Sequence, residues 1–191
     1  MTEIVFATNN QNKINEIEIL LKPAYHIKKL FDIGCNEELP ETHLTIEENS
    51  AEKADYIYNT YNVNCFSEDS GLEVEALNGE PGVHSAYYAG DRDAGRNMDM
   101  VLKKMEKQKN RNAQFKTVIT LIINGLKYQF TGILKGKIGF EKKGLYGFGY
   151  DPIFVLEDGR SLAELMLDEK SRISHRSIAT KKLITFLAEL D

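Results

Sequence analysis

The hydrophobic positions of the chain fall into short apolar runs, alternating stretches and helix-like repeats. Residues 3–7 form an apolar run typical of a buried strand, and apolar residues at helical spacing follow from Ile14 to Leu21. The polar segment 8–13 lies between them. This order predicts a strand, a polar loop and a helix.

A β-hairpin is predicted in the second half of the chain. Apolar residues alternate through residues 115–122 and again through 126–130, and Asn124-Gly125, a dipeptide that favours tight hairpin turns, separates them. Strands and helices alternate unevenly, which favours an α/β fold with mixed strand pairing over a fully parallel sheet. Further strands are predicted at residues 25–31, 63–66 and 72–77.

A second helix is predicted to begin near Thr45. Thr45 and Glu48 have the Ser/Thr-x-x-Glu spacing of a capping box, and Ala51, Ala54 and Ile57 follow at helical spacing. The capping box gives Glu48 a structural role, so Glu48 is a weaker candidate for a metal ligand.

Two adjacent carboxylates stand at the centre of the segment Phe66-Ser67-Glu68-Asp69-Ser70-Gly71-Leu72. The flanking apolar runs predict that this segment is a glycine turn between two strands, where a metal site can be built. The alternative is that Asp69, Ser70 and Gly71 are ordinary turn formers.

The predicted loop at residues 8–13 is a candidate anion site. Backbone N–H groups and the positive end of the helix dipole favour anions there, and Lys13 adds a full charge. The alternative is that Thr8 or an asparagine caps the helix.

Near the other end of the chain, residues 144–152 interleave glycines with aromatics, and the basic segment 170–176 opens the last predicted helix. These two segments indicate a nucleobase pocket.

Charge and length narrow the class of protein. The chain has 191 residues, which favours one domain over residues 1–191, and a formal net charge of −5, which argues against general nucleic-acid binding. The basic cluster 103–111 follows Val101 and Leu102, so it is interpreted as the exposed face of a helix rather than a binding patch.

Cysteine usage and hydropathy predict a cytoplasmic protein without a membrane partner. Cys35 and Cys65 have no metal-ligand spacing and are expected to be reduced thiols, with Cys65 in the core. The longest apolar stretch, residues 118–123, is too short to span a bilayer.

Several motifs together resemble the inosine triphosphate pyrophosphatase family. They follow the family's order over nearly the whole chain. Two positions depart from the family pattern: Asn9 stands where many relatives have glycine, and Tyr87 stands where an arginine is common. The matching motifs are Ala7-Thr8-Asn9-Asn10 with Lys13 and Glu16, Glu48-Asn49 with Lys53-Ala54, Glu68-Asp69-Ser70-Gly71-Leu72, residues 79–86, residues 147–154, and Glu169-Lys170-Ser171 with Ser174-His175-Arg176.

The resemblance implies a long, mixed, twisted sheet flanked by helices, with two lobes around a central cleft. It implies hydrolysis of deaminated purine nucleoside triphosphates (ITP, dITP, XTP) to monophosphate and pyrophosphate, with Mg²⁺ as cofactor, and a homodimer. Mg²⁺ suits the chemistry because it prefers oxygen ligands and the substrate's own phosphates.

The resemblance also implies roles for individual residues. Glu41 and Asp69 would bind the metal, and Asp69 would orient or deprotonate the attacking water. The alternatives are that Lys53 is a solvated helix lysine and that Phe148 is a core aromatic. The proposed phosphate-binding residues are Thr8, Asn9, Asn10, Gln11, Asn12, Lys13, Lys53 and Ser70. The proposed base-binding residues are Phe148, Gly149, Tyr150, Asp151, Lys170, His175 and Arg176.

Donor groups in this set favour a base with a 6-oxo group, because adenine presents an amino donor at that position and would leave a protein donor unpaired. Two other functions stay open. One is a pyrophosphatase for other modified nucleotides, and the other is a noncatalytic nucleotide sensor.

Overall fold

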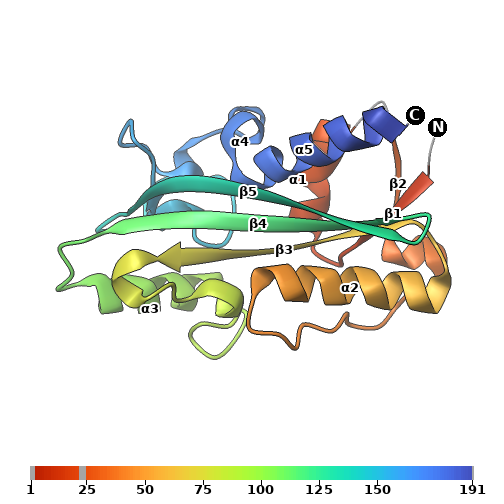
Figure 1. The fold of residues 1–191 in the computed structure, drawn as a ribbon. Helices are drawn as coiled ribbons and strands as arrows, with labels where there is room; N and C mark the ends of the chain where they lie inside the picture. The colour runs from red at the N-terminus through yellow and green to blue at the C-terminus, as the bar shows by residue number, and fades with distance from the viewer. Residues whose placement is uncertain (1–2, 22–24, 191) are drawn as a thin grey trace. The chain divides into compact units, whose positions relative to one another are not determined.

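The computed structural model describes residues 3–21 and 25–190, which form an α/β fold (Figure 1). Among these residues, the α-helices are α1 (Gln11–Leu21), α2 (Ile46–Tyr61), α3 (Ala94–Met105), α4 (Leu167–Ile173) and α5 (His175–Leu190). The strands are β1 (Glu3–Ala7), β2 (His26–Lys28), β3 (Cys65–Val74), β4 (Asn112–Ile123), β5 (Leu126–Ile138) and β6 (Phe154–Val155).

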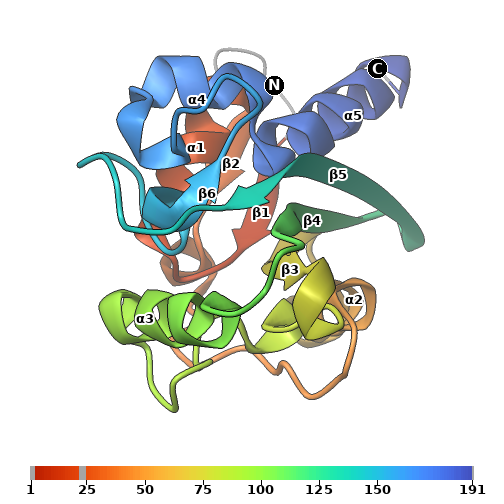
Figure 2. The same cartoon turned by 90° about the vertical axis from the view of Figure 1, so that its left-hand side faces the viewer.

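The strands form one mixed sheet in the order β2-β1-β3-β4-β5-β6. Strand β1 pairs in parallel with β2 and β3, whereas β6 pairs antiparallel with the end of β5 (Figure 2). The predicted hairpin is present as β4 and β5, joined by Asn124 (φ 52°) and Gly125 (φ 79°). Positive φ at both residues is the geometry of a two-residue hairpin turn. The predicted mixed sheet is confirmed.

The chain divides into two compact units. The first unit consists of residues 1–69, 117–132 and 176–191, and the second consists of residues 70–116 and 133–175. Each unit is assembled from separate chain segments, which is compatible with the single domain predicted for residues 1–191. The predicted central cleft and the single domain both stay predictions.

Each unit has its own apolar core. In the first unit, Phe6 of β1 stacks on Phe66 of β3 with ring centroids 4.5 Å apart, and Ile17 of α1 packs in the same cluster. In the second unit, Val101 and Met105 of α3 pack with Phe154 and its neighbours. Lys103 and Lys104 lie exposed on α3, as the predicted helix requires.

Strand β3 corrects the prediction of two short strands separated by a glycine turn. It runs without interruption through Ser67, Asp69 and Gly71. The physical reason is that both faces of β3 are covered and its buried polar side chains have partners on neighbouring elements, so the polar run does not need to leave the sheet. Successive side chains alternate between faces, which sends Glu68 and Asp69 in opposite directions.

Other element boundaries also differ from the predictions. Strand β3 ends at Val74, and Glu75–Leu77 form a 3₁₀ turn instead of extending the strand to residue 77. Strand β2 ends at Lys28, and residues 30–33 form a 3₁₀ turn instead of extending the strand. The basic segment 170–176 does not open a single helix, because Ser174 has extended backbone (φ −63°, ψ 154°) and separates α4 from α5.

The predicted N-cap of α2 at Thr45 is confirmed, and Glu48 is bonded to the Thr45 hydroxyl. Thr45 Oγ1 accepts a hydrogen bond from the Glu48 backbone N–H at 3.2 Å and donates one to Glu48 Oε2 at 2.7 Å. Within the described part of the chain, no helix has the length and hydropathy needed to cross a membrane.

Candidate active site

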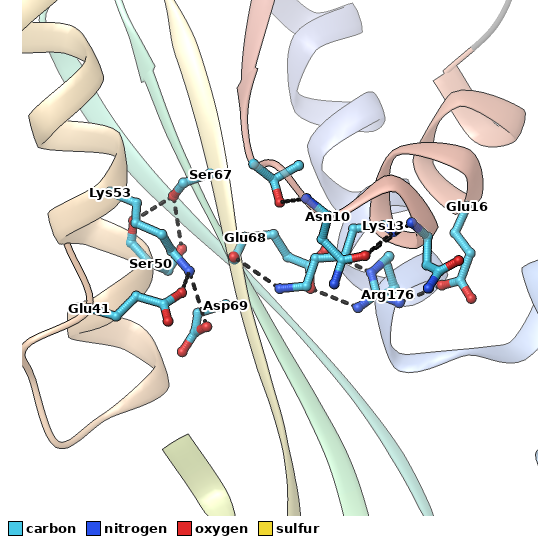
Figure 3. A network of polar contacts seen from close by, with 12 residues as sticks. Asn10, Lys13, Glu16, Glu41, Ser50, Lys53, Ser67, Glu68, Asp69 and Arg176 are labelled. Atoms are coloured by element: carbon cyan, nitrogen blue, oxygen red, sulfur yellow. Dashed lines mark hydrogen bonds and ion pairs between the residues drawn. The ribbon is translucent and has the colours of Figure 1, made fainter. Parts of the chain in front are cut away.

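Asp69 of β3, Lys53 of α2 and Glu41 meet in the first unit (Figure 3). Lys53 Nζ donates hydrogen bonds to Asp69 Oδ1 at 3.1 Å and to Glu41 Oε1. Lys53 is only 5% exposed, so the alternative of a solvated helix lysine is wrong. One ammonium group therefore links two carboxylates, Glu41 and Asp69, that lie far apart in the sequence.

Burial and charge oppose each other at this contact. Burial raises the pKa of Asp69, and the nearby Lys53 and Lys13 offset only part of that rise. Burial alone would lower the pKa of Lys53, but the charges of Asp69 and Glu41 outweigh it and leave the Lys53 pKa raised. Lys53 therefore stays positively charged at neutral pH, and Asp69 is a stronger proton acceptor than an ordinary aspartate.

The same contact tests whether a divalent cation fits here. Glu41 and Asp69 both contact the Lys53 ammonium, so oxygens of two carboxylates lie close enough together to share one cation. No cluster of three or more His, Cys, Asp or Glu side chains suited to a metal occurs within the described ranges. Mg²⁺ is commonly held by one or two carboxylates together with water and substrate phosphates, so this pair fits the ion.

The opposite face of β3 carries a second charged group. Arg176 of α5 donates to both carboxylate oxygens of Glu68, from Nε at 2.7 Å and from Nη2 at 3.0 Å, and its Nη1 donates to Glu16 of α1. Arg176 is 1% exposed. Burial would lower the pKa of Arg176, but Glu68 and Glu16 outweigh burial and raise it. The guanidinium is thus a fixed positive charge between two buried carboxylates.

Lys13 borders this charged group from α1. Its Nζ lies 3.5 Å from Glu68 Oε1 and 3.5 Å from the Glu68 carbonyl oxygen. Burial lowers the pKa of Lys13, and the charge of Glu68 opposes part of that effect. Lys13 and Lys53 therefore lie on either side of the Glu68–Asp69 pair, each in contact with a different carboxylate.

In the second unit, the glycine-rich segment folds around Asp151. Asp151 Oδ2 accepts hydrogen bonds from the Phe148 backbone N–H at 2.8 Å and from Lys170 Nζ at 2.6 Å. Gly147 has φ 76°, and a Cβ there would lie 2.2 Å from Asp151 Oδ2. Only glycine fits at this position. Lys170 Nζ also lies 4.8 Å from the centre of the Phe148 ring, so a lysine, a carboxylate and a partly exposed aromatic ring converge.

Comparison with known proteins identifies the family, because the Ham1 family profile matches residues 4–186. The chain belongs to the Ham1 family. It is 52% identical over 187 residues to a dITP/XTP pyrophosphatase of Flavobacterium johnsoniae, with 97% of both chains covered. It is 40% identical over 193 residues to the dITP/XTP pyrophosphatase of Bacillus subtilis, with 98% of both covered.

Solved Ham1 structures have the same fold. The Staphylococcus aureus Ham1 protein superposes with a TM-score of 0.92 at 38% identity and covers 100% of both chains. A HAM1 protein from Coxiella burnetii superposes with a TM-score of 0.92 at 35% identity, over 99% of this chain and 100% of the other. The predicted family resemblance and fold class are confirmed.

Within this Ham1 protein, the loop before α1 caps the helix. Asn10 Oδ1 accepts hydrogen bonds from the backbone N–H groups of Asn12 at 3.0 Å and Lys13 at 3.3 Å, and Thr8 Oγ1 accepts from the Asn10 backbone N–H at 3.1 Å. The capping alternative is therefore present. Gln11 donates to Asn15 at 2.7 Å. Phosphate binding by this loop, including exposed Asn9, stays a prediction, with the Lys13 side chain as its main charge.

The base-binding residues divide between two environments. Phe148, Gly149, Tyr150, Asp151 and Lys170 share the second unit with His175, whose ring stacks on Phe115 at 4.6 Å between centroids. Tyr150 donates to the Ser85 carbonyl at 2.8 Å, which anchors the loop. Arg176 belongs to the first unit, where its guanidinium contacts the carboxylates of Glu68 and Glu16.

Three residues of these sites make contacts that the sequence did not indicate. Glu16 and Glu68 bind Arg176, and Phe115 supports His175. Glu16 lies three positions after Lys13 on one helix, so its side chain shares a face with the predicted phosphate lysine. That spacing is a signal that could have identified Glu16. Phe115 carries no comparable signal, because it fits the apolar alternation of β4.

Proposed function

We propose that this Ham1 family protein hydrolyses deaminated purine nucleoside triphosphates, namely ITP, dITP and XTP, to nucleoside monophosphate and pyrophosphate. The names of its dITP/XTP pyrophosphatase relatives at up to 52% identity support this reaction. The structural observation that carries the proposal is the contact of buried Lys53 with both Glu41 and Asp69. This contact places a cation that could bind phosphate next to two carboxylates that could bind a metal ion and position a water.

Charge neutralisation is the first requirement of this chemistry, because the triphosphate brings several negative charges to a protein of net charge −5. Glu41 and Asp69 would hold Mg²⁺, which supplies neutralising charge on the phosphate oxygens. Lys13 and Lys53 are proposed to contact the phosphates. The polar residues proposed to contact the phosphates as well are Thr8, Asn9, Asn10, Gln11, Asn12 and Ser70.

Asp69 is the proposed catalytic residue. Its carboxylate would orient a water toward the α-phosphorus and accept a proton as the new P–O bond forms, while the bond to the β-phosphate breaks and pyrophosphate leaves. Its raised pKa suits a proton acceptor. Nearby Lys53 would limit the movement of the carboxylate through the 3.1 Å hydrogen bond.

Base selection is assigned to the second unit. Phe148 is proposed to stack on the purine, with Gly149 and Tyr150 shaping the loop, and Lys170 and His175 as donors to the 6-oxo group. Asp151 Oδ2 accepts a hydrogen bond from Lys170 Nζ at 2.6 Å and would orient that lysine toward the base. The proposed role of Arg176 at the base is tested separately, because its guanidinium already contacts Glu16 and Glu68.

We further propose a homodimer in the cytoplasm. The homodimer rests on the family resemblance. The two cysteines, Cys35 and Cys65, are free and buried, as expected of thiols that form no disulfide.

The products test the reaction type. Incubation of the protein with ITP and Mg²⁺ is expected to yield IMP and pyrophosphate in equal amounts, measured by anion-exchange chromatography. Formation of IDP and phosphate would contradict cleavage between the α- and β-phosphates. Binding without any product would favour a nucleotide sensor instead.

Removal of the Lys13 charge tests the phosphate site. Lys13→Ala is expected to weaken binding of ITP much more than binding of inosine, because the lysine is proposed to contact the phosphates and no other part of the nucleotide. Calorimetric titration with both ligands measures the two affinities. Lys103→Ala, an exposed lysine on α3, is the control and should leave both unchanged. Equal losses for ITP and inosine in Lys13→Ala would mean that Lys13 has a structural role.

A further inference from the structure

Helix α2 contacts strand β3 through two pairs of polar side chains. Ser50 and Lys53 lie three positions apart on one face of α2, and Ser67 and Asp69 lie two positions apart on one face of β3. The charged pair is Lys53 with Asp69, and the neutral pair is Ser50 with Ser67, whose Oγ atoms are 3.2 Å apart (Figure 3). The neutral pair is therefore the neighbour of the proposed catalytic pair along the same helix–strand contact.

The neutral pair continues into a chain of hydrogen bonds. Ser50 Oγ lies 2.8 Å from Thr120 Oγ1 of β4, and Thr120 Oγ1 accepts from Gln129 Nε2 of β5 at 3.0 Å. Gln129 Nε2 also donates to the Glu47 carbonyl in the first turn of α2 at 2.9 Å. We call Ser50, Ser67, Thr120 and Gln129 the hydroxyl chain.

The direction of every hydrogen bond in the hydroxyl chain follows from counting hydrogens. Ser67 Oγ donates to the Ser50 carbonyl at 2.5 Å, so the Ser50 hydroxyl donates to Ser67 Oγ. Gln129 can only donate through its NH₂ group, so the Thr120 hydroxyl hydrogen is free to donate to Ser50 Oγ. Each hydroxyl thus gives one hydrogen and accepts one, and the chain is complete.

The hydroxyl chain is buried, so each of its hydrogen bonds must be made within the protein. Ser50, Ser67 and Thr120 are each 0% exposed, so water cannot replace a bond that is lost. A shift of α2 along β3 would break the hydroxyl chain and would at the same time move Lys53 relative to Asp69. A buried polar network has one satisfied geometry, and it imposes that geometry on its neighbours.

We propose that the hydroxyl chain fixes the position of α2 on β3 and thereby sets the placement of Lys53 against Asp69, with Thr120 as a positioning residue for the metal and water site. This inference rests on the proposed function for its catalytic meaning. It also predicts cation binding in the absence of nucleotide, which does not depend on the identity of the substrate.

Thr120→Val tests the inference, because valine keeps the shape of threonine and removes the hydroxyl. Strand β4 supplies a matched control in Thr117, which is also 0% exposed but whose Oγ1 has no hydrogen-bond partner among the described residues. Thr117→Val makes the same chemical change on the same strand outside the hydroxyl chain. Thr120→Ser restores the hydroxyl.

Two quantities are measured for each variant. The first is the affinity for Mn²⁺ alone, an oxygen-binding substitute for Mg²⁺, from the electron paramagnetic resonance signal of free Mn²⁺. The second is kcat for ITP at saturating Mg²⁺. Thr120→Val is expected to lower Mn²⁺ affinity or kcat by about tenfold, the lower end of the range for residues that orient metal ligands. Thr120→Ser and Thr117→Val should retain wild-type values.

Wild-type Mn²⁺ affinity and kcat in a folded Thr120→Val protein would overturn the inference, and so would an equal loss in Thr117→Val. If Thr120→Val does not fold, Gln129→Met tests the exposed end of the chain and should lower the same quantities by a smaller factor. Unchanged quantities there would also overturn it. Absence of ITP hydrolysis by the wild-type protein would contradict the proposed function, whereas the Mn²⁺ comparison would still decide the positioning role.

Discussion

Asp69→Asn is expected to reduce turnover of ITP by roughly a hundredfold or more, the usual effect of losing a positioned acid–base group. Asparagine has nearly the same shape as aspartate, but it neither accepts the water proton nor supplies a charged ligand for the ion. Lys53 keeps Glu41 as a partner, so the variant should fold. Steady-state kinetics with pyrophosphate detection give the comparison.

The control for this variant is Asp55→Asn. Asp55 is a partly exposed carboxylate on α2, paired with Lys127 at 2.6 Å, and it lies outside the proposed site. Its removal should leave turnover unchanged. Near-wild-type turnover in a clean preparation of Asp69→Asn would remove Asp69 from the mechanism.

Arg176→Met is expected to lower the free energy of unfolding by about 3–5 kcal/mol, the range for removing one partner of a buried ion pair. The loss has a clear physical cause. Without the guanidinium, the buried carboxylates Glu16 and Glu68 lose their main cation, and Lys13 at 3.5 Å from Glu68 compensates poorly. Urea denaturation followed by circular dichroism measures the change.

Arg172→Met is the matched control, since Arg172 lies on α4 with 77% of its side chain exposed. Exposed ion pairs contribute about 0–1 kcal/mol, so this variant should be close to wild type in stability. An equally small effect of Arg176→Met would show that Arg176 does not stabilise the two carboxylates. Arg176→Met also tests whether Arg176 recognises the base. Loss of a donor to the 6-oxo group should lower kcat/KM for ITP more than for ATP. A parallel decrease would remove Arg176 from base selection.

Local features of the fold could be predicted from the sequence because their causes are local. The turn at Asn124-Gly125 requires positive φ at both positions, and these two residues tolerate it well. Thr45 and Glu48 satisfy each other across one helical turn. Each signal lies within a few residues of the structure that it determines.

Strand β3 could not be predicted because its causes are distant in the sequence. Ser67 is satisfied by Ser50, and Glu68 is satisfied by Arg176, which lies 108 positions away. Polar residues in an apolar context predict a turn when their partners are unknown. Three-dimensional pairing reverses that prediction, because a satisfied polar side chain can be buried in a strand.

The residues of the candidate site could be predicted in part, but their contacts with residues far away in the sequence could not. The resemblance indicated Glu41, Lys53 and Asp69, and the structure brings these three side chains into contact. The environment of Arg176 was not predictable, since its partner Glu16 lies 160 positions away on another helix. Burial of Lys53 likewise depends on the packing of α2 against β3 rather than on any local pattern.

Pyrophosphate release from a panel of nucleoside triphosphates tests the proposed function most directly. The wild-type protein is incubated with Mg²⁺ and with ITP, dITP, XTP, GTP, ATP or CTP, and kcat/KM is determined for each. We predict that ITP, dITP and XTP are hydrolysed with far higher kcat/KM than ATP, GTP and CTP, and that Asp69→Asn loses this activity on all three. Equal rates for ATP and ITP, or a preference for a pyrimidine nucleotide, would contradict selection of deaminated purines.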